Sequence, residues 1–497
     1  AGIAVILIKK NYLFVDGRYT IQALQESAEN FEIIEIHKKM PHNIIKNHNL
    51  GYDPRLFTSQ NLKNYFLNNN LISVNDNLVD QIFKFKEKNT KPFYSLGKNI
   101  IGETHQSKIS NIANFLKSNK ADYLFISAPE NVAWLLNIRG FDNPNSPIPN
   151  ARLIIDKDKK FFLITKKNNT KQIIKERKIK KNQVIDIGDL PNLIIKLKGK
   201  SFIIDNKSCS IFYENMIKSK FKILDKNDPI YKLKSIKNSH EINHTIEAHK
   251  KDGLALTKFI YWIKNINKKS ITEVEAQNKL EKFRKLNKDY LFPSFNTIAG
   301  SGSNGAIVHY RAKAETTKRV NKKDLLLVDS GGQYSYGTTD VTRTISFNRQ
   351  KKSIKNAYTN VLKGHIAVAL TNLSKDNTGK KIDIRARKFL KKEGLDYAHG
   401  TGHGVGFFLN VHEGPQSISK YNTIKIQEGM ILSNEPGYYK KDFFGIRIEN
   451  LIYVKRLSNK LFFENFTLAP FEKDLIDYEL LNKIEKDYLF RYHLNIY

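Results

Sequence analysis

Residues 399–408, with the sequence HGTGHGVGFF, restrict the fold of this chain more than any other segment. Every second residue from Gly400 to Gly406 is a glycine, and so many glycines disfavour a helix. In an extended strand alternate side chains lie on opposite faces, so the glycines would share one face and His399 and His403 the other. We therefore expect an extended segment whose glycine face another part of the chain approaches closely.

Two aspartates belong to strand-like segments at residues 324–347. The pattern predicts a buried strand that ends at Asp329, a glycine-containing hairpin turn, and an alternating strand that carries Asp340. Such a hairpin would bring the two aspartates face to face, although they are 11 residues apart. An aspartate at the end of a strand can simply begin a turn, but aspartate is rare inside strands, so Asp340 indicates a function more strongly.

Two glutamates accompany further strands of the same region. Glu435 follows an apolar run and precedes a Pro-Gly turn, and the alternation of residues 445–454 places Arg447 and Glu449 on one strand face. A single glutamate in such a strand is usually an edge or ion-pair residue. Three of the 13 histidines of the chain, His399, His403 and His412, also fall within one stretch of 14 residues. One shared site explains these residues better than separate roles do.

Four carboxylates and one imidazole could hold two divalent cations that share bridging carboxylates. The candidate ligands are Asp329, Asp340, His403, Glu435 and Glu449. Four negative charges balance two dications, whereas the same cluster without cations would repel itself. Two ions about 3.5–4 Å apart hold a water, lower its pKa towards about 7 and polarise the bond that it attacks. The residues therefore indicate metal-assisted hydrolysis.

The rest of the chain suggests three units, as the length of 497 residues allows. Residues 1–106 and 107–232 have α/β patterns, and residues 233–497 alternate helices and strands in an α+β arrangement. The chain opens on two strand-like runs, with Asp16-Gly17 as a turn signal, and a helix is expected to follow. Because it begins at Ala1 inside the first run, we expect a fragment whose start lies upstream.

The composition of the chain bears on its partners and its cellular compartment. The net charge of +34 comes from lysines spread along the chain, and no nucleic-acid motif accompanies them, so we interpret the charge as compositional and expect no nucleic-acid partner. The single Cys209 excludes an intramolecular disulfide and fits a reducing compartment. No apolar run reaches the length of about 18 residues that spans a bilayer. We expect a cytoplasmic protein without membrane contact.

The five candidate ligands, in their order and local motifs, resemble the dinuclear site of the pita-bread metallopeptidases, specifically the X-Pro aminopeptidases (aminopeptidase P). The resemblance covers nearly the whole chain. Its further motifs are VDGRYTIQA, GYDP, NVAWLLNIRG, KNSHEINHTIEAHKKDGLAL and TLAPFEKDLID. This breadth favours the long, three-domain form over methionine aminopeptidase. It implies a pita-bread catalytic domain after two creatinase-like α/β domains, the first of them incomplete.

The resemblance also implies residue roles. Asp329 and Asp340 would bind one metal and His403 the other, while Asp340 and Glu449 bridge and Glu435 completes the ligand set of the second ion. The metal would be manganese, with cobalt or zinc able to occupy the same ligands. The implied catalytic histidines, which would orient the peptide, stabilise the tetrahedral intermediate and pass a proton, are His309, His399 and His412. Arg447 would tune Glu449 from outside the metal shell.

The implied activity is hydrolysis of the bond before a proline in second position by a metal-bridging hydroxide, which releases one amino acid. Substrates would be short peptides, and the protein would be a cytoplasmic homodimer. Two alternatives remain open at this point. A prolidase shares the site but requires a dipeptide with a free carboxylate. A catalytically inactive pita-bread binding protein would typically lack metal ligands, all five of which are present here.

Overall fold

The computed structural model describes residues 2–83, 91–266 and 271–497, so Ala1 of the opening run lies outside the described residues. The chain forms two compact units. One consists of residues 36–234, and the other joins residues 1–35 to residues 235–497. Among the described helices, none combines the length and the apolar character needed to cross a membrane.

The unit of residues 36–234 is built around a six-stranded mixed sheet in the order β11-β10-β9-β7-β12-β13. Its strands are β4 (Asn49–Tyr52), β5 (Asn70–Ser73), β6 (Tyr94–Ser95), β7 (Tyr123–Ile126), β8 (Ile138–Arg139), β9 (Arg152–Asp156), β10 (Phe161–Ile164), β11 (Val184–Ile185), β12 (Ser201–Ile204) and β13 (Lys222–Asp225). Its helices are α2 (Pro41–Ile44), α3 (Ser59–Phe66), α4 (Leu78–Ile82), α5 (Lys98–Ile101), α6 (His105–Ser118), α7 (Pro129–Leu136), α8 (Lys171–Lys175), α9 (Leu190–Lys196), α10 (Ile211–Lys218) and α11 (Ile230–Ser235). Strands β7 and β12 are buried throughout, and Cys209 packs in the apolar cluster beside them. The alternation of helices and strands expected for this part is therefore confirmed.

The other unit begins with a small sheet and one helix. The elements are β1 (Gly2–Ile6), β2 (Asn11–Val15), α1 (Thr20–Ser27) and β3 (Glu32–Glu35). β1 and β2 pair antiparallel and β3 joins β2 in parallel. The two opening strands and the helix after the Asp16-Gly17 turn are thus where the sequence predicts them.

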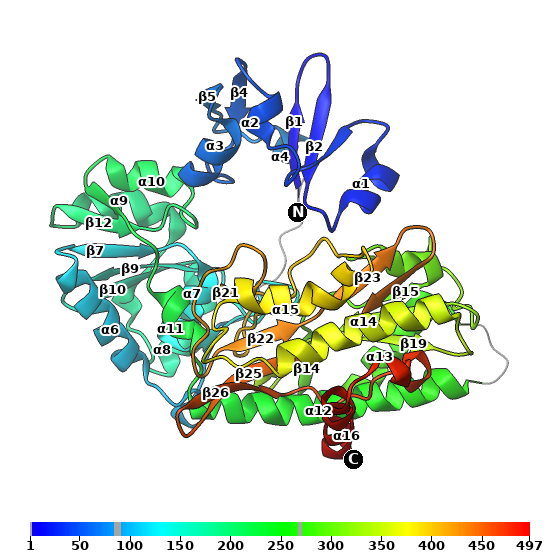
Figure 1. The fold of residues 1–497 in the computed structure, drawn as a ribbon. Coiled ribbons are helices and arrows are strands. Elements are labelled where there is room, and N and C mark those ends of the chain that lie inside the picture. The colour runs from blue at the N-terminus through cyan, green and yellow to red at the C-terminus, as the bar shows by residue number, and fades with distance from the viewer. Residues whose placement is uncertain (1, 84–90, 267–270) are drawn as a thin grey trace. The chain divides into compact units, whose positions relative to one another are not determined.

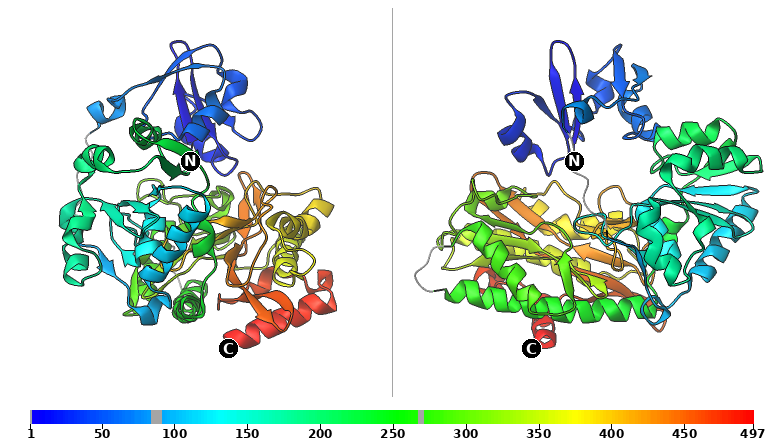
Figure 2. Two further views of the ribbon diagram at one scale, coloured as in Figure 1. Left: turned by 90° about the vertical axis from the view of Figure 1, so that its left-hand side faces the viewer. Right: turned by 180° about the vertical axis from the view of Figure 1, so that it is seen from behind.

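Residues 235–497 form layers of strands covered by helices on both faces (Figures 1 and 2). The strands are β14 (Tyr290–Pro293), β15 (Ile298–Ser301), β16 (Leu325–Ser330), β17 (Gly332–Tyr334), β18 (Gly337–Thr338), β19 (Val341–Ser346), β20 (Gly402–Gly404), β21 (Glu413–Ile418), β22 (Ile431–Asn434), β23 (Gly437–Lys440), β24 (Phe444–Arg447), β25 (Asn450–Leu457) and β26 (Lys460–Asn465). The helices are α12 (Ser239–Asn265), α13 (Glu273–Lys285), α14 (Lys352–Ala369), α15 (Gly379–Lys392) and α16 (Lys483–Ile496). The two main sheets have the orders β15-β16-β19 and β21-β20-β22-β25-β26.

Alternation along β16 explains the two helical layers. Leu325 packs in the cluster formed with α14 and α15, whereas the next residue, Leu326, packs in the cluster formed with α12 and α13. Successive side chains of a strand lie on opposite faces, so a strand that is apolar throughout is covered on both. β16 and β19 are indeed buried at every residue. A polar side chain in these strands therefore sits in the interior of the unit.

Candidate metal and catalytic site

The two aspartates lie together, although not by the simple hairpin that the sequence suggests. Asp329 is in β16 and pairs with Thr342 of β19, as expected for an antiparallel pair. Asp340, expected inside a strand, instead lies directly before β19. The reason is that residues 332–338 form their own small hairpin, β17–β18, and β17 pairs with β14. The predicted proximity of these segments is confirmed, and the predicted strand position of Asp340 is wrong.

The two glutamates come from the neighbouring strands. Glu435 follows β22 directly, so its predicted position at the end of an apolar strand is confirmed. The uninterrupted strand expected around Glu449 is wrong, because the chain leaves β24 at Arg447 and enters β25 at Asn450. β24 pairs with β23, whereas β25 pairs with β22 and β26, so Glu449 lies where the chain changes sheets.

The glycine segment is closely packed, as its sequence predicts. A Cβ atom at Gly402 would lie 1.9 Å from the Ser433 carbonyl oxygen, and one at Gly404 would lie 2.5 Å from that of Glu413. Glycine is therefore required where β20 approaches β22 and β21. Only residues 402–404 form a strand, and His399 lies in the irregular segment before it.

His403 lies beside two of the carboxylates. Its Nε2 atom lies 3.4 Å from an oxygen of Asp340 and 3.5 Å from an oxygen of Glu435. Ligand atoms of Asp340, His403 and Glu449 all lie within 4.8 Å of one another. Three side chains that converge so closely could share a metal ion.

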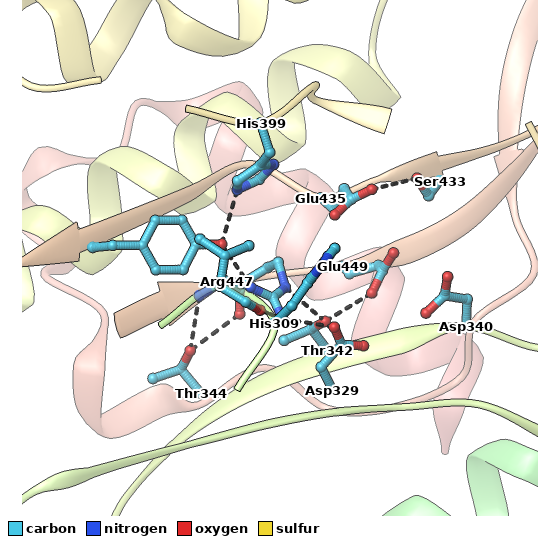
Figure 3. Close-up of polar contacts among 12 residues, drawn as sticks. His309, Asp329, Asp340, Thr342, Thr344, His399, Ser433, Glu435, Arg447 and Glu449 are labelled. Carbon is cyan, nitrogen blue, oxygen red and sulfur yellow. Dashed lines mark hydrogen bonds and ion pairs between the residues drawn. The ribbon is translucent and has the colours of Figure 1, made fainter. Parts of the chain in front are cut away.

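Two hydroxyl groups orient the glutamates. Thr342 donates to Glu449 at 2.7 Å, and Ser433 donates to Glu435 at 3.0 Å (Figure 3). Neither hydroxyl residue was predicted from the sequence. Thr342 stands two residues after Asp340 and so was open to inference from strand alternation, whereas Ser433 gave no comparable signal.

The negative charges of this cluster would be balanced by bound cations. Burial, together with repulsion by Asp329 and Glu435, raises the pKa of Asp340 well above its usual range. Burial and repulsion by Asp340 do the same to the pKa of Glu449, and burial also raises that of Glu435. Among the described residues no donor reaches the buried Oδ1 atom of Asp329. Strong acceptors that repel one another and lack donors fit a pair of divalent cations.

Arg447 joins the cluster to a tyrosine that the sequence analysis did not single out. Its guanidinium, 1% exposed as a residue, donates to Asp329 at 2.6 Å and to the hydroxyl of Tyr439 at 2.7 Å. That hydroxyl lies 2.8 Å from Nε2 of His399, whose Nδ1 lies 2.7 Å from the Gly400 carbonyl oxygen. A carbonyl only accepts, so Nδ1 carries the proton and Tyr439 donates to Nε2. No sequence pattern distinguishes Tyr439 from its neighbour Tyr438.

The other two candidate histidines flank the cluster. The rings of His403 and His412 have their centroids 4.1 Å apart, and the proximity of His403 and burial lower the pKa of His412 to about 2. Burial and the charges of Arg18 and Arg447 lower the pKa of His309 to about 3. Both imidazoles are therefore neutral near neutral pH.

One cavity of about 650 Å³ contains the whole set. Its lining includes all nine predicted site residues, namely His309, Asp329, Asp340, His399, His403, His412, Glu435, Arg447 and Glu449. Residues of the N-terminal segment, among them Arg18 and Tyr19, line the same cavity. The structure thus brings together every residue that the sequence analysis assigned to the site.

Comparisons with known families agree with this site. The profile of metallopeptidase family M24 matches residues 243–456, and that of its C-terminal region matches residues 459–497. The Creatinase/Prolidase N-terminal domain matches residues 85–241. The architecture is therefore a mixed α/β chain with a creatinase-like N-terminal part and a pita-bread catalytic domain.

Similar proteins extend the match to the whole chain. Xaa-Pro aminopeptidase 1 of Dictyostelium discoideum is 35% identical over an alignment of 545 residues, which covers all of this chain and 84% of that protein. Aminopeptidase P2 of Arabidopsis thaliana is 34% identical and covers all of this chain and 78% of that protein.

Solved structures match either the whole chain or part of it. The X-prolyl aminopeptidase of Caenorhabditis elegans, described as a cytosolic enzyme with a di-nuclear active site, superposes with a TM-score of 0.91 at 27% identity and covers 100% of this chain and 86% of that one. Prolidase of Pyrococcus furiosus, at 26% identity, reaches a TM-score of 0.57 and covers 71% of this chain and 98% of that one. The full-length similarity shows that the chain belongs to the M24 metallopeptidases and, within them, to the Xaa-Pro aminopeptidases.

Proposed function

We propose that this chain is a metal-dependent aminopeptidase that hydrolyses the bond before a proline in second position and releases one N-terminal amino acid from short peptides. The observation that carries the proposal is the convergence of all nine predicted residues on one cavity. The similarity of the whole chain to Xaa-Pro aminopeptidases supports the choice of substrate.

We propose that two divalent cations, manganese in the first place and cobalt or zinc as substitutes, bind at the four carboxylates and His403. Asp329 and Asp340 would hold one ion and His403 and Glu435 the other, with Asp340 and Glu449 available to both. When bound, such ions supply an activated water and polarise the carbonyl group that is attacked. The unsatisfied Asp329 oxygen and the repulsion among the buried carboxylates support this assignment.

The remaining residues hold the peptide and its protons. His309 and His412, both neutral, provide ring nitrogens for the peptide carbonyl and the proline nitrogen. His399 is held in one tautomer between Gly400 and Tyr439, and its place in the cavity wall suits a role in orienting the peptide. Arg447 donates to both Asp329 and Tyr439, and so it fixes the position of Asp329 relative to His399, the partner of Tyr439.

The deciding experiment compares an X-Pro-Y tripeptide with a Gly-Pro dipeptide, using metal-stripped protein with and without added manganese. Release of the first residue from the tripeptide only with metal, and its loss in Asp340→Asn, would support the proposal. Cleavage of the dipeptide alone would indicate a prolidase. No hydrolysis of either substrate by folded, manganese-loaded protein would contradict the enzymatic function. It would favour the alternative of a catalytically inactive binding protein.

We further propose the division into residues 1–106, 107–232 and 233–497, which the ranges of the matching profiles support in part. A homodimer in the cytoplasm, without a nucleic-acid or membrane partner, is part of the same proposal. The description of the C. elegans enzyme as cytosolic supports the location. Sedimentation of the purified protein would test the dimer.

A further inference from the structure

The turn at Asp16–Tyr19 has no role in the function proposed so far, yet it lines the catalytic cavity. Arg18 and Tyr19 both belong to the cavity wall. The turn and the catalytic residues lie in the same compact unit of the chain. A short segment at the start of the chain therefore contributes side chains to a cavity whose other lining residues come from residues 295–449.

The turn has a well-defined conformation of its own. The Asp16 carboxylate accepts two bonds from the Arg18 guanidinium, both at 2.9 Å, and one from the Arg18 backbone N–H at 3.0 Å. The backbone N–H of Tyr19 donates to the Asp16 carbonyl at 3.0 Å. A bidentate arginine–carboxylate pair fixes geometry more strongly than a single bond does. The Tyr19 side chain is therefore presented from a braced turn.

Two contacts connect this turn to segments that carry catalytic histidines. The Tyr19 hydroxyl lies 2.7 Å from Nδ1 of His309, and the two rings meet edge to face with centroids 5.0 Å apart. A Cβ atom at Gly17 would lie 3.0 Å from the Cβ of Ala398, the residue before His399. Both contacts place the turn against the cavity wall.

The backbone around His309 is also held. The Arg447 guanidinium donates to the Val308 carbonyl at 3.4 Å, and the hydroxyl of Tyr310 donates to Glu273 at 2.8 Å. These two bonds fix neither the tautomer nor the ring orientation of His309. A neutral imidazole carries one proton, and the partner of one ring nitrogen decides which nitrogen holds it.

The chemistry of the hydroxyl decides between the tautomers. If Nδ1 donated to Tyr19, Nε2 would be an acceptor, and the carbonyl oxygen of a peptide in the cavity is an acceptor too. If Tyr19 donates, Nε2 carries the proton and becomes a donor. Nε2 has no hydrogen-bond partner among the described residues, so it is free to serve the peptide.

We propose that Tyr19 is a positioning residue, which donates to Nδ1 of His309 and so fixes the tautomer that offers an Nε2–H donor to the peptide carbonyl oxygen. The proposal rests on the proposed aminopeptidase function. A donor aimed at a carbonyl oxygen gains strength as negative charge develops on that oxygen, so its effect appears in kcat more than in KM.

Tyr19→Phe removes the hydroxyl and keeps the ring. We expect kcat on an X-Pro-Y tripeptide to fall roughly tenfold with KM nearly unchanged, the size expected for one lost hydrogen bond to the catalytic machinery. Tyr12→Phe is the matched control, because Tyr12 lies on β2 of the same segment and outside the cavity wall. An unchanged kcat in Tyr19→Phe, or an equal loss in Tyr12→Phe, would overturn the proposal.

The tautomer can be measured without turnover. Long-range ¹H–¹⁵N spectra of metal-free protein labelled with ¹⁵N-histidine report which ring nitrogen carries the proton, and His309→Gln identifies the signal. We expect protonated Nε2 in the wild type and a mixture of tautomers in Tyr19→Phe. Protonated Nδ1 in the wild type, or the same spectrum for both proteins, would overturn the proposal. A wild type that cleaves no peptide would count against the proposed function instead, because the spectra test the hydrogen bond independently.

Discussion

Replacing Asp340 by asparagine should have opposite effects on stability without and with manganese. Asp340 is 4% exposed, and one of its oxygens lies within 4.8 Å of ligand atoms of His403 and Glu449. Two carboxylates at such a separation repel by about 3 kcal/mol at an effective dielectric constant of about 20. Partial protonation already relieves some of this repulsion in the wild type. We therefore expect the metal-free variant to be more stable than the metal-free wild type by roughly 1–3 kcal/mol.

Manganese should reverse the order. A ligand that binds only the folded state stabilises it by about 2.7 kcal/mol at a concentration 100 times its dissociation constant. The variant lacks one of the proposed bridging carboxylates, so it should gain little from manganese and should not hydrolyse the peptide. The wild type gains both the stabilisation and the activity.

Thermal unfolding of both proteins, after chelation and then over a manganese titration near neutral pH, measures both effects. Asp442→Asn is the matched control, because Asp442 is an exposed residue of the turn between β23 and β24 and should behave as wild type. A metal-free Asp340→Asn variant that is less stable than the metal-free wild type would refute repulsion among the carboxylates. A variant that keeps the full stabilisation by manganese would refute the role of Asp340 as a ligand.

Three further changes test other parts of the site. The folded-state pKa values of Asp340, Glu435 and Glu449 are raised, so these three groups bind more protons in the folded metal-free protein than in the unfolded chain, and the stability that they contribute should fall as the pH rises from about 4 through the raised values. Buried histidines with lowered pKa values, such as His249 and His365, have the opposite effect but act alike in the wild type and in Asp340→Asn. Urea unfolding of both metal-free proteins across this range should therefore give the variant a less negative or more positive slope of stability against pH, and equal slopes would contradict the electrostatic argument. Arg447→Met leaves Oδ2 of Asp329 without the donor that it has in the wild type, and it should lower the affinity for manganese about 10- to 100-fold. Calorimetric titration measures this affinity, and an unchanged affinity would show that Arg447 does not position Asp329. Gly402→Ala places a carbon 1.9 Å from the Ser433 carbonyl and should cost about 3 kcal/mol of unfolding free energy, whereas Gly188→Ala, with no atom within 4 Å, should be tolerated; equal stability of the two variants would refute the packing argument.

The sequence alone indicated which residues make up the candidate site. Continuous apolar runs located β16 and β22, and so placed Asp329 and Glu435 beside buried strands. The spacing of glycines from Gly400 to Gly406 predicted the close approach that Gly402 and Gly404 make. These features could be predicted because strand period and the absence of a side chain are properties of neighbouring residues.

Only the tertiary structure decided how these pieces meet. Strand alternation reports which face is buried but not which strand is the partner, so neither the β17–β18 hairpin before Asp340 nor the change of sheet at Glu449 could be inferred. The bond from Arg447 to Asp329 spans 118 residues, and that from Tyr19 to His309 spans 290. Contacts of this kind produce no periodic pattern in the sequence, because each depends on how the folded chain positions two segments that are far apart in the sequence. The sequence therefore named the candidate ligands and histidines, and the fold placed Tyr439, Thr342 and Tyr19 in contact with them.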